Sequence, residues 1–330
     1  MLAYLVRRLI LALLTTWAVS VLAYVVIELP PGDYITSYIA QMSSSGSFVS
    51  AQEAEALRQQ YGLDQPLYIQ YLRWMGMVLQ GNFGMALEYG RPVAEVIGDR
   101  LWLTMVVSVG AIIFTWIVAL PIGIYSAVRQ YSVGDYIATF VGFIGLAVPS
   151  FMLALILMYF GFTLFNANIG GLFSDELAEA PWSLAKAWDL TKHLPLPALI
   201  LGFAGTAQLI RIMRANLLDE LGKPYVVTAR ARGLSETRLI LKYPVRVALN
   251  PFASTIGYLL PYVVSGSIIV SLVLSLPTVG PLLLKALVAQ DMFLAGTIVL
   301  LLGVMTVIGT FLSDLLLMWI DPRIRFEGKQ

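Results

Sequence analysis

Long runs of apolar residues limit what this chain can fold into more than any other feature of its sequence. A helix that spans a bilayer needs about 20 mainly apolar residues. Six stretches meet this requirement: roughly Leu9–Leu29, Leu101–Val128, Tyr136–Phe165, Leu196–Met213, Ala248–Leu276 and Met292–Ile320. Charged residues make up only 12% of the 330 residues, about half of the share usual in soluble proteins. The sequence therefore predicts an all-α, polytopic membrane protein with six transmembrane helices.

The first apolar run has a second interpretation, because Arg7 and Arg8 followed by apolar residues also fit a secretory signal peptide. The core of a signal peptide has roughly 7–15 apolar residues, and this run is longer. We therefore expect a retained helix.

The distribution of charge predicts the orientation of the chain. Lys and Arg gather in cytoplasmic loops, and with six spans the basic segments all fall on one side: Arg7 and Arg8, Arg129, the loop 214–247, and the tail from Arg323. The segments 31–100 and 166–194 are acidic or balanced and fall on the other side. Both termini are therefore expected in the cytoplasm.

The long outer segment contains two predicted helices. Residues 51–63 have helix-forming composition with apolar residues at helical spacing, and Gly62 is a plausible C-cap. Residues 65–81 predict a helix with Pro66 in its first turn and with Tyr71 and Trp74 on one apolar face. This second helix lies at the outer membrane interface, where Tyr and Trp are favoured, or it belongs to a small packed cap.

The chain lacks the residues that several functional classes need. The chain has no cysteine and a single histidine, His193, which excludes a disulfide framework and a Cys/His metal cluster. It has no His-Glu-x-x-His motif and no phosphate-binding Gly-x-x-x-x-Gly-Lys-Ser/Thr loop. Residues 132–135 (SVGD) end like the Gly-x-Gly-Asp of intramembrane aspartyl proteases, but Ser132 replaces the first glycine. We therefore expect no catalytic residue and no metal site.

Charges within the apolar runs mark ion and proton pathways, and here they are nearly absent. Glu28 lies at the outer end of the first run, and Asp314 lies close to the inner end of the last. A proton-driven carrier would need a titratable group near the midplane. Prolines and glycines interrupt several runs, and they fit either a gated path between helices or an ordinary packed bundle.

One basic stretch, YVVTARARGLSETR (225–238), interrupts the apolar chain inside the loop 214–247. It predicts a helix through Ala231, a break at Gly233, and a second helix that starts near Glu236 with Ser235 as its cap. Small residues on the first helix would let it dock closely into a groove of another protein. Alternatively, the arginines hold anionic lipid headgroups and set the topology.

This stretch resembles the cytoplasmic coupling motif of ABC importer permeases, most closely that of the dipeptide, oligopeptide and nickel subgroup. The subgroup pattern Tyr-x-x-Thr-Ala-Arg-Ala-Lys-Gly-Leu is nearly matched by Tyr225, Thr228, Ala229, Arg230, Ala231, Arg232, Gly233 and Leu234. The likeness covers most of the chain and includes LPPGDY (29–34), YGLDQPLYIQYLRW (61–74) and DLLLMWIDPRIRF (314–326). The chain departs from the pattern at Val227, Val247 and Thr278, which weakens any inference that a dipeptide is the cargo.

The resemblance implies a type I ABC importer permease fold with cytoplasmic termini in the bacterial inner membrane. Residues 1–100 would form one transmembrane helix plus a long periplasmic segment, and residues 101–330 the permease domain with five helices. Residues Thr228, Ala229, Arg230, Ala231, Arg232, Gly233 and Leu234 would couple the chain to an ATPase subunit.

The resemblance also implies partners and cargo. The partners would be a second homologous permease, two ATP-binding subunits, a periplasmic substrate-binding protein and membrane lipid, with no nucleic acid. The chain itself would be no enzyme and hold no cofactor, since ATP and Mg would bind in the ATPase subunits. Peptides are the expected cargo; oligosaccharides, opines and nickel chelates are alternatives within the class. An ATP-independent carrier and a non-transporting scaffold are the rival classes.

Overall fold

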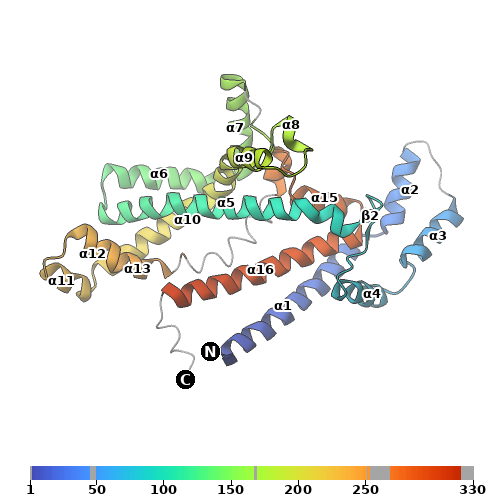
Figure 1. The fold of residues 1–330 in the computed structure, drawn as a ribbon, viewed down its shortest axis with the longest axis horizontal. Helices are drawn as coiled ribbons and strands as arrows, with labels where there is room; N and C mark the ends of the chain where they lie inside the picture. The colour runs from blue at the N-terminus through green and yellow to red at the C-terminus, as the bar shows by residue number, and fades with distance from the viewer. Residues whose placement is uncertain (1, 45–49, 167–168, 251, 253–267, 321–330) are drawn as a thin grey trace. The chain divides into compact units, whose positions relative to one another are not determined.

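The described part of the chain is mostly helical. The computed structural model describes residues 2–44, 50–166, 169–250, 252 and 268–320 (Figure 1). The helices are α1 (Leu2–Glu28), α2 (Tyr34–Ser44), α3 (Ala51–Tyr61), α4 (Leu67–Leu79), α5 (Val93–Val128), α6 (Val133–Ala147), α7 (Ser150–Phe165), α8 (Asp175–Ala178), α9 (Leu184–His193), α10 (Pro195–Leu221), α11 (Pro224–Ala231), α12 (Glu236–Lys242), α13 (Pro244–Ala248), α15 (Val279–Val288) and α16 (Met292–Ile320). Two short antiparallel strands, β1 (Met85–Ala86) and β2 (Arg91–Pro92), pair with Met85 opposite Pro92. The all-α prediction is thus confirmed except for this hairpin.

Within the described ranges, four helices are long and apolar enough to cross a membrane: Ile10–Glu28, Val93–Val128, Leu184–Leu221 and Met292–Leu317. They correspond to the first, second, fourth and sixth predicted runs. The predicted starts of the second and fourth runs were too late, because the helices continue into more polar sequence beyond the apolar core. The fifth run, Ala248–Leu276, lies mostly outside the described residues.

The third predicted span, Tyr136–Phe165, is not one helix. It consists of α6 and α7, which are bent by 103° relative to each other at Val148 and Pro149. Pro149 has no backbone N–H, and the residue before a proline is sterically pushed out of the α region. Val148 accordingly has extended dihedrals, φ −92° and ψ 119°. The apolar run continues on both sides of this proline, so hydrophobicity alone wrongly predicted one straight span.

The chain divides into two compact units. One comprises residues 105–277 and 305–330, and the other comprises residues 2–104 and 278–304, so that α5 and α16 each contribute to both. The predicted division into residues 1–100 and 101–330 follows the pattern of the resembled family and not the compactness of the fold. It stays a prediction.

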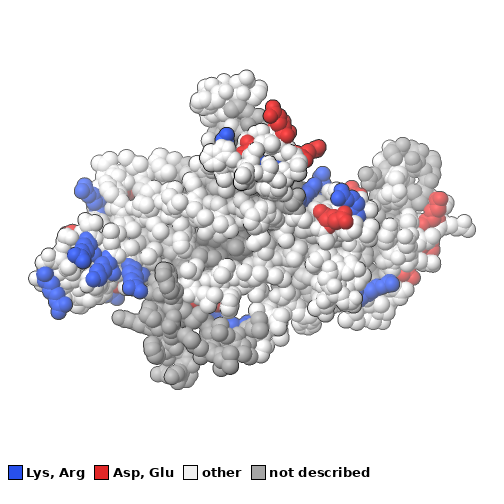
Figure 2. Space-filling view, in the orientation of Figure 1, with Lys and Arg blue, Asp and Glu red and all other residues white. Residues whose placement is uncertain are grey.

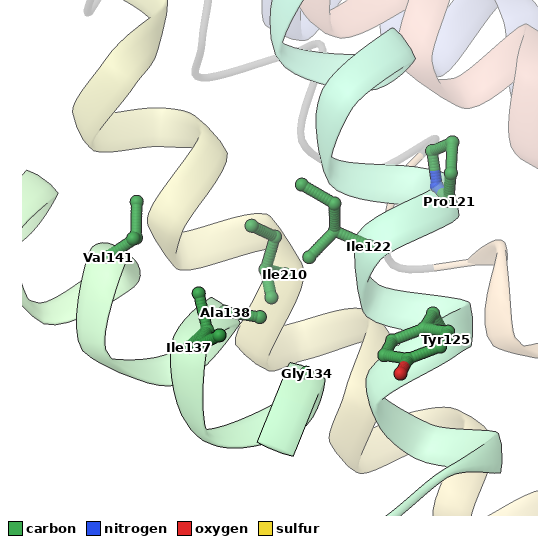
Figure 3. A pocket seen from close by; sticks show the side chains of 8 residues that line it. All are labelled: Pro121, Ile122, Tyr125, Gly134, Ile137, Ala138, Val141 and Ile210. Atoms are coloured by element: carbon green, nitrogen blue, oxygen red, sulfur yellow. The ribbon is translucent and has the colours of Figure 1, made fainter. Parts of the chain in front are cut away.

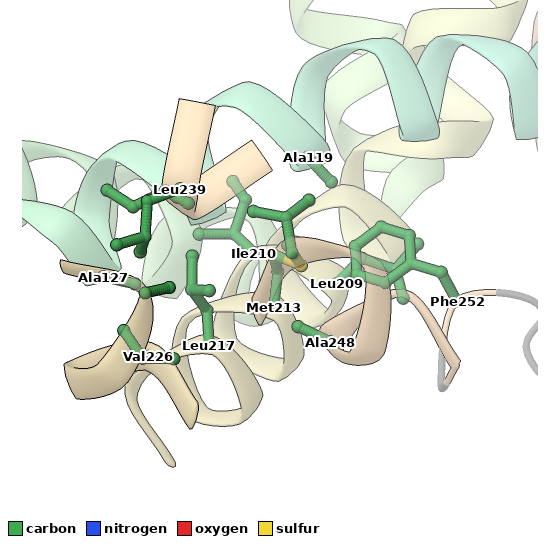
Figure 4. Packing of buried hydrophobic residues seen from close by; sticks show 13 residues of the cluster. Ala119, Ala127, Leu209, Ile210, Met213, Leu217, Val226, Leu239, Ala248 and Phe252 are labelled. Carbon is green, nitrogen blue, oxygen red and sulfur yellow. The ribbon is translucent and has the colours of Figure 1, made fainter. Parts of the chain in front are cut away.

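In the first unit, α10 is the central helix. It packs against α6, α7 and α13, and its Leu209, Met213 and Leu217 are almost completely buried in an apolar cluster that also includes Phe252 (Figure 4). Helix α5 approaches α10 closely at Gly202, whose carbonyl oxygen accepts a hydrogen bond of 3.2 Å from the Thr115 hydroxyl. This core supports the loop that carries the basic stretch.

The second unit contains the predicted outer helices. The prediction of a helix that Gly62 ends is confirmed, since α3 ends at Tyr61 and Gly62 has φ +72°. The start of α3 carries a capping box between Ser50 and Glu53, a signal visible in the sequence but missed. Trp74 on α4 is 1% exposed, with its ring centroid 6.0 Å from that of Tyr24 on α1.

The opposite face of α4 remains uncovered in the structure. Its Tyr68, Leu72 and Leu79 are each more than 60% exposed. Helix α4 therefore packs on α1, as expected for a cap, through the face of Tyr71 and Trp74 that the interfacial prediction placed at the membrane, and the apolar face that it exposes is a different one.

Candidate coupling surface

The basic stretch forms two short helices that are anchored on the core of the first unit. Helix α11 starts with Pro224 in its first turn, where the missing N–H has no consequence. Val226 and Ala229 on α11 are 0% and 8% exposed, and Leu239 on α12 is 0% exposed. All three belong to the same apolar cluster as Leu217 of α10 (Figure 4). The burial of these residues fixes which side of α11 faces outward.

Gly233 ends the first helix, as predicted from the sequence. Its φ is +78°, a left-handed conformation that side chains other than glycine and asparagine resist. Its N–H donates to the Arg230 carbonyl at 3.0 Å. A Cβ at this position would meet no atom within 4 Å. The space in front of Gly233 is therefore open.

The two short helices are joined by an ion pair across the break. Arg230 donates from Nε to Glu236 Oε1 at 2.5 Å and from Nη2 to Oε2 at 3.1 Å. The side-chain hydrogen bond from Arg230 lowers the pKa of Glu236. Exposed pairs add little to stability, so this pair mainly orients the helices around Gly233.

Ser235 occupies the N-cap position of α12, as predicted, but its side chain makes no capping hydrogen bond. Helix α12 ends at Lys242 and α13 begins at Pro244, because this proline cannot continue the hydrogen-bonding pattern of α12.

The predicted coupling residues do not all face the same way. Thr228, Arg230, Ala231, Arg232 and Gly233 are exposed. Ala229 is buried in the core and Leu234 is half-buried against it. These two residues hold the helix, whereas the other five form its outer surface.

Two further exposed residues on α11 were not among the predicted coupling residues. Val227 is 57% exposed and supplies an apolar contact surface beside Ala231. Tyr225 is 38% exposed, and its hydroxyl donates to Glu220 Oε2 at 2.5 Å. Desolvation, followed by the hydrogen bond to Glu220, raises the pKa of Tyr225. The helical period combined with the buried Val226 could have identified Val227.

A buried ion pair ties α10 to the neighbouring helices close to this surface. Arg214 donates from Nε to Asp135 Oδ1 at 3.0 Å and from Nη2 to Oδ2 at 2.9 Å. The Ser126 hydroxyl on α5 also donates to Asp135, which is 2% exposed. The SVGD segment thus supplies a structural carboxylate that joins α5, α6 and α10. The sequence of this segment resembles only part of a protease motif and gives no sign of the structural role of Asp135.

Positive charge gathers over the α11 and α12 end of the first unit (Figure 2). The exposed basic residues of this region are Lys223, Arg230, Arg232, Arg238, Lys242 and Arg246. Among the described residues, no group of three or more His, Cys, Asp or Glu side chains could hold a metal ion. The surface is suited to bind an acidic or polar protein groove, or anionic headgroups.

Comparisons with known proteins identify the family of this chain. Residues 119–326 match the family model described as binding-protein-dependent transport system inner membrane component, and residues 1–108 match the N-terminal model of the same components. The chain is 33% identical to the oligopeptide transport system permease protein AppB of Bacillus subtilis, covering 99% of this chain and 100% of the relative. It is also 33% identical to the glutathione transport system permease protein GsiC of Escherichia coli K12, with the same coverage. The chain therefore belongs to the family of inner membrane components of binding-protein-dependent transport systems.

Proposed function

We propose that this chain is a permease subunit that translocates peptides across the bacterial inner membrane, driven by ATP hydrolysis in partner subunits. The proposed class of cargo rests on the end-to-end similarity to an oligopeptide permease and a glutathione permease. Oligopeptides and glutathione share peptide bonds and charged ends. A translocation path for either would therefore accept an extended, polar molecule. No observation favours oligosaccharides, opines or nickel chelates over this class.

The proposed topology has six spans and cytoplasmic termini. It adds the run Ala248–Leu276 and one broken span, α6 with α7, to the four apolar helices. The gathering of basic side chains over α11 and α12 supports a cytoplasmic position for that end of the first unit. The segments 31–100 and 166–194 would then face the periplasm and help to receive the substrate-binding protein.

The proposed coupling contact uses the outer surface of α11 and the break at Gly233. Thr228, Arg230, Ala231, Arg232 and Gly233 would lie in a groove of an ATPase subunit, with Val227 as an added apolar contact. Ala229 and Leu234 would hold the helix to its own core. ATP and Mg would bind in the two ATPase subunits, and a second homologous permease would complete the path.

The packing suggests how a push on α11 would reach the membrane. Val226 and Ala229 share one close-packed cluster with Leu217 and Met213 of α10, and close-packed interiors transmit displacement instead of absorbing it. Arg214 then links α10 to α6 through Asp135. A displacement of α11 would therefore move α10 and α6 together.

The test is expression of the chain with its neighbouring genes, purification in mild detergent, and uptake assays in vesicles. We expect co-purifying ATPase subunits and a second permease, with ATP-dependent uptake of labelled peptides. Uptake of an oligosaccharide or a nickel chelate in place of peptides would overturn the cargo. Uptake that survives ATP depletion would indicate a secondary carrier, and a chain that purifies alone without ATPase activity would indicate a scaffold.

A further inference from the structure

An apolar groove lies between α5, α6 and α10 within the first unit (Figure 3). Its volume is about 480 Å³. The lining residues are Pro121, Ile122 and Tyr125 on α5, Gly134, Ile137, Ala138 and Val141 on α6, and Ile210 on α10. Apart from the Tyr125 hydroxyl, these side chains are hydrocarbon, so the groove suits an apolar ligand of substantial size.

The groove opens onto a surface that is itself apolar. Ile137 and Phe140 on α6 are 58% and 66% exposed, and Val141 is 45% exposed. An exposed apolar surface of this kind on a membrane protein faces lipid tails or another membrane helix. A ligand can therefore enter the groove from within the bilayer without crossing water.

Aromatic residues mark one end of the groove as the level of the headgroups. Tyr125, Tyr131 and Tyr136 stand at the turn between α5 and α6, and they are 43%, 69% and 62% exposed. Tyrosine concentrates where hydrocarbon meets the headgroup region. Ile137 and Val141 lie progressively further along α6, toward the hydrocarbon.

A positive charge stands at that same end. Arg129 is exposed and follows Tyr125 by four residues, with its N–H donating to the Tyr125 carbonyl at 2.9 Å, so both residues lie on the same helical face. The nearest acidic residue in the sequence, Asp135, is buried and already paired with Arg214. None of the ion pairs formed by the described residues involves Arg129. Its charge is thus free to meet an anion.

We propose that this groove binds an anionic phospholipid, with one acyl chain between α5 and α6 and the phosphate at Arg129. A phospholipid supplies the apolar body and the negative head in one molecule, in the order that the groove and Arg129 require. A second membrane protein would have to bring both an apolar helix and an acidic residue to the same place. The leaflet, which would be the cytoplasmic one, rests on the proposed orientation; the binding itself does not depend on peptide transport.

The test uses the full-length chain reconstituted into phosphatidylethanolamine vesicles with phosphatidylglycerol that carries a photoreactive diazirine on its acyl chain. We expect labelled peptides from residues 121–125 and 137–141. Ala138→Phe fills the groove and should reduce this labelling at least several-fold. The matched control Ala147→Phe adds the same ring to an exposed position of α6 outside the groove, and it should leave the labelling unchanged.

The head of the lipid is tested by a charge change that leaves the core intact. A basic residue near a membrane surface contributes about 1 kcal/mol of attraction to anionic lipid, so Arg129→Gln should reduce the preference for phosphatidylglycerol over phosphatidylethanolamine roughly fivefold. Arg73→Gln removes an exposed charge on α4, outside both the groove and the basic surface of α11 and α12, and should preserve the preference at this site.

Three results would overturn the proposal. Labelling spread evenly over the exposed face of α6 would indicate bulk lipid only. Equal labelling in Ala138→Phe and Ala147→Phe would show that the labelled lipid does not occupy the groove. Subunit-to-subunit crosslinks from a photoreactive residue at position 137, in place of lipid adducts, would identify a second permease copy as the occupant. Peptide uptake measured on the same vesicles reports separately on the proposed function.

Discussion

Arg214 and Asp135, 79 residues apart in the chain, form a two-point ion pair whose carboxylate is almost completely buried. The carboxylate also accepts hydrogen bonds from the Ser126 hydroxyl and, at 2.9 Å, from the Tyr131 N–H. Every strong acceptor site of Asp135 is therefore used. Arg214 lies on α10, the helix that supports α11, and Asp135 lies on α6, so removal of the pair should affect both the packing of the first unit and the proposed coupling.

Removal of the positive partner should strongly destabilise the first unit. Arg214→Ala leaves Asp135 charged and buried, and breaking a buried pair in this way costs about 3–5 kcal/mol. We expect a value near the lower end, since the Arg214 side chain is 26% exposed. The apparent melting temperature in detergent should fall by several degrees. Arg246→Ala, at an exposed position, is the control; an equal shift in both variants would contradict a structural role for the pair.

Gly202 should not tolerate a side chain, because α5 lies too close. A Cβ there would lie 2.7 Å from Thr115 Oγ1 and 3.0 Å from the Ala111 carbonyl oxygen. Overpacking of this kind costs about 1–3 kcal/mol, and Gly202→Val should reach the upper end. Gly222→Val is the matched control, since its Cβ would approach no atom closer than 4.0 Å. Thermal unfolding of the two variants compares them, and similar melting temperatures would show that α5 yields easily.

Gly233 separates an effect within the chain from an effect on a partner. Gly233→Asn adds a neutral side chain that tolerates the left-handed turn, whereas Gly233→Asp adds a negative charge of nearly the same shape. The open space at this position excludes a steric clash, so Gly233→Asn should change the stability of the purified chain little, and Gly233→Asp should lower it modestly because of the positive φ. If Gly233 docks into an ATPase groove, peptide-stimulated ATP hydrolysis should fall at least tenfold in Gly233→Asp.

The comparison with Gly233→Asn reports which property of the side chain matters. Loss of coupling in both variants would assign the effect to volume, and loss only in Gly233→Asp would assign it to charge. Full coupling in both variants, together with normal melting temperatures, would remove this turn from the proposed contact.

Asp291 should make the stability of the second unit depend on pH. It is completely buried at the start of α16, and it accepts hydrogen bonds of 3.1 Å from the N–H groups of Glu88 and Leu294. Desolvation raises its pKa to about 6. The folded state therefore retains the proton between about pH 4 and pH 6 while the unfolded state has lost it, so stability decreases as pH rises through this window and is constant above it.

Asp291→Asn removes this titration, so the melting temperature of the wild-type chain should decline more steeply between pH 4 and pH 6 than that of the variant. The control is Asp64→Asn, at an exposed position of the same unit, which should retain the wild-type slope. Parallel slopes for the wild-type chain and Asp291→Asn would mean that the carboxyl group titrates normally.

Local rules predicted the elements that depend on local sequence. The breaks at Gly62 and Gly233 follow from the freedom of glycine to adopt a positive φ, and the structure places both where they were expected. The bend at Pro149 is a local effect too, and it was missed only because the apolar run through Tyr136–Phe165 was treated as continuous.

The sequence by itself determined that the chain is a helical membrane protein and where the helices of its basic stretch break, because hydrophobicity and backbone preferences act over one or two turns of helix. Only the tertiary structure decided that Ala229 faces the core while Val227 faces outward, because their roles depend on which side of α11 meets α10. The same holds for Asp135 and Arg214: a carboxylate and a guanidinium 79 residues apart carry no sign of each other until packing brings them within 3.0 Å.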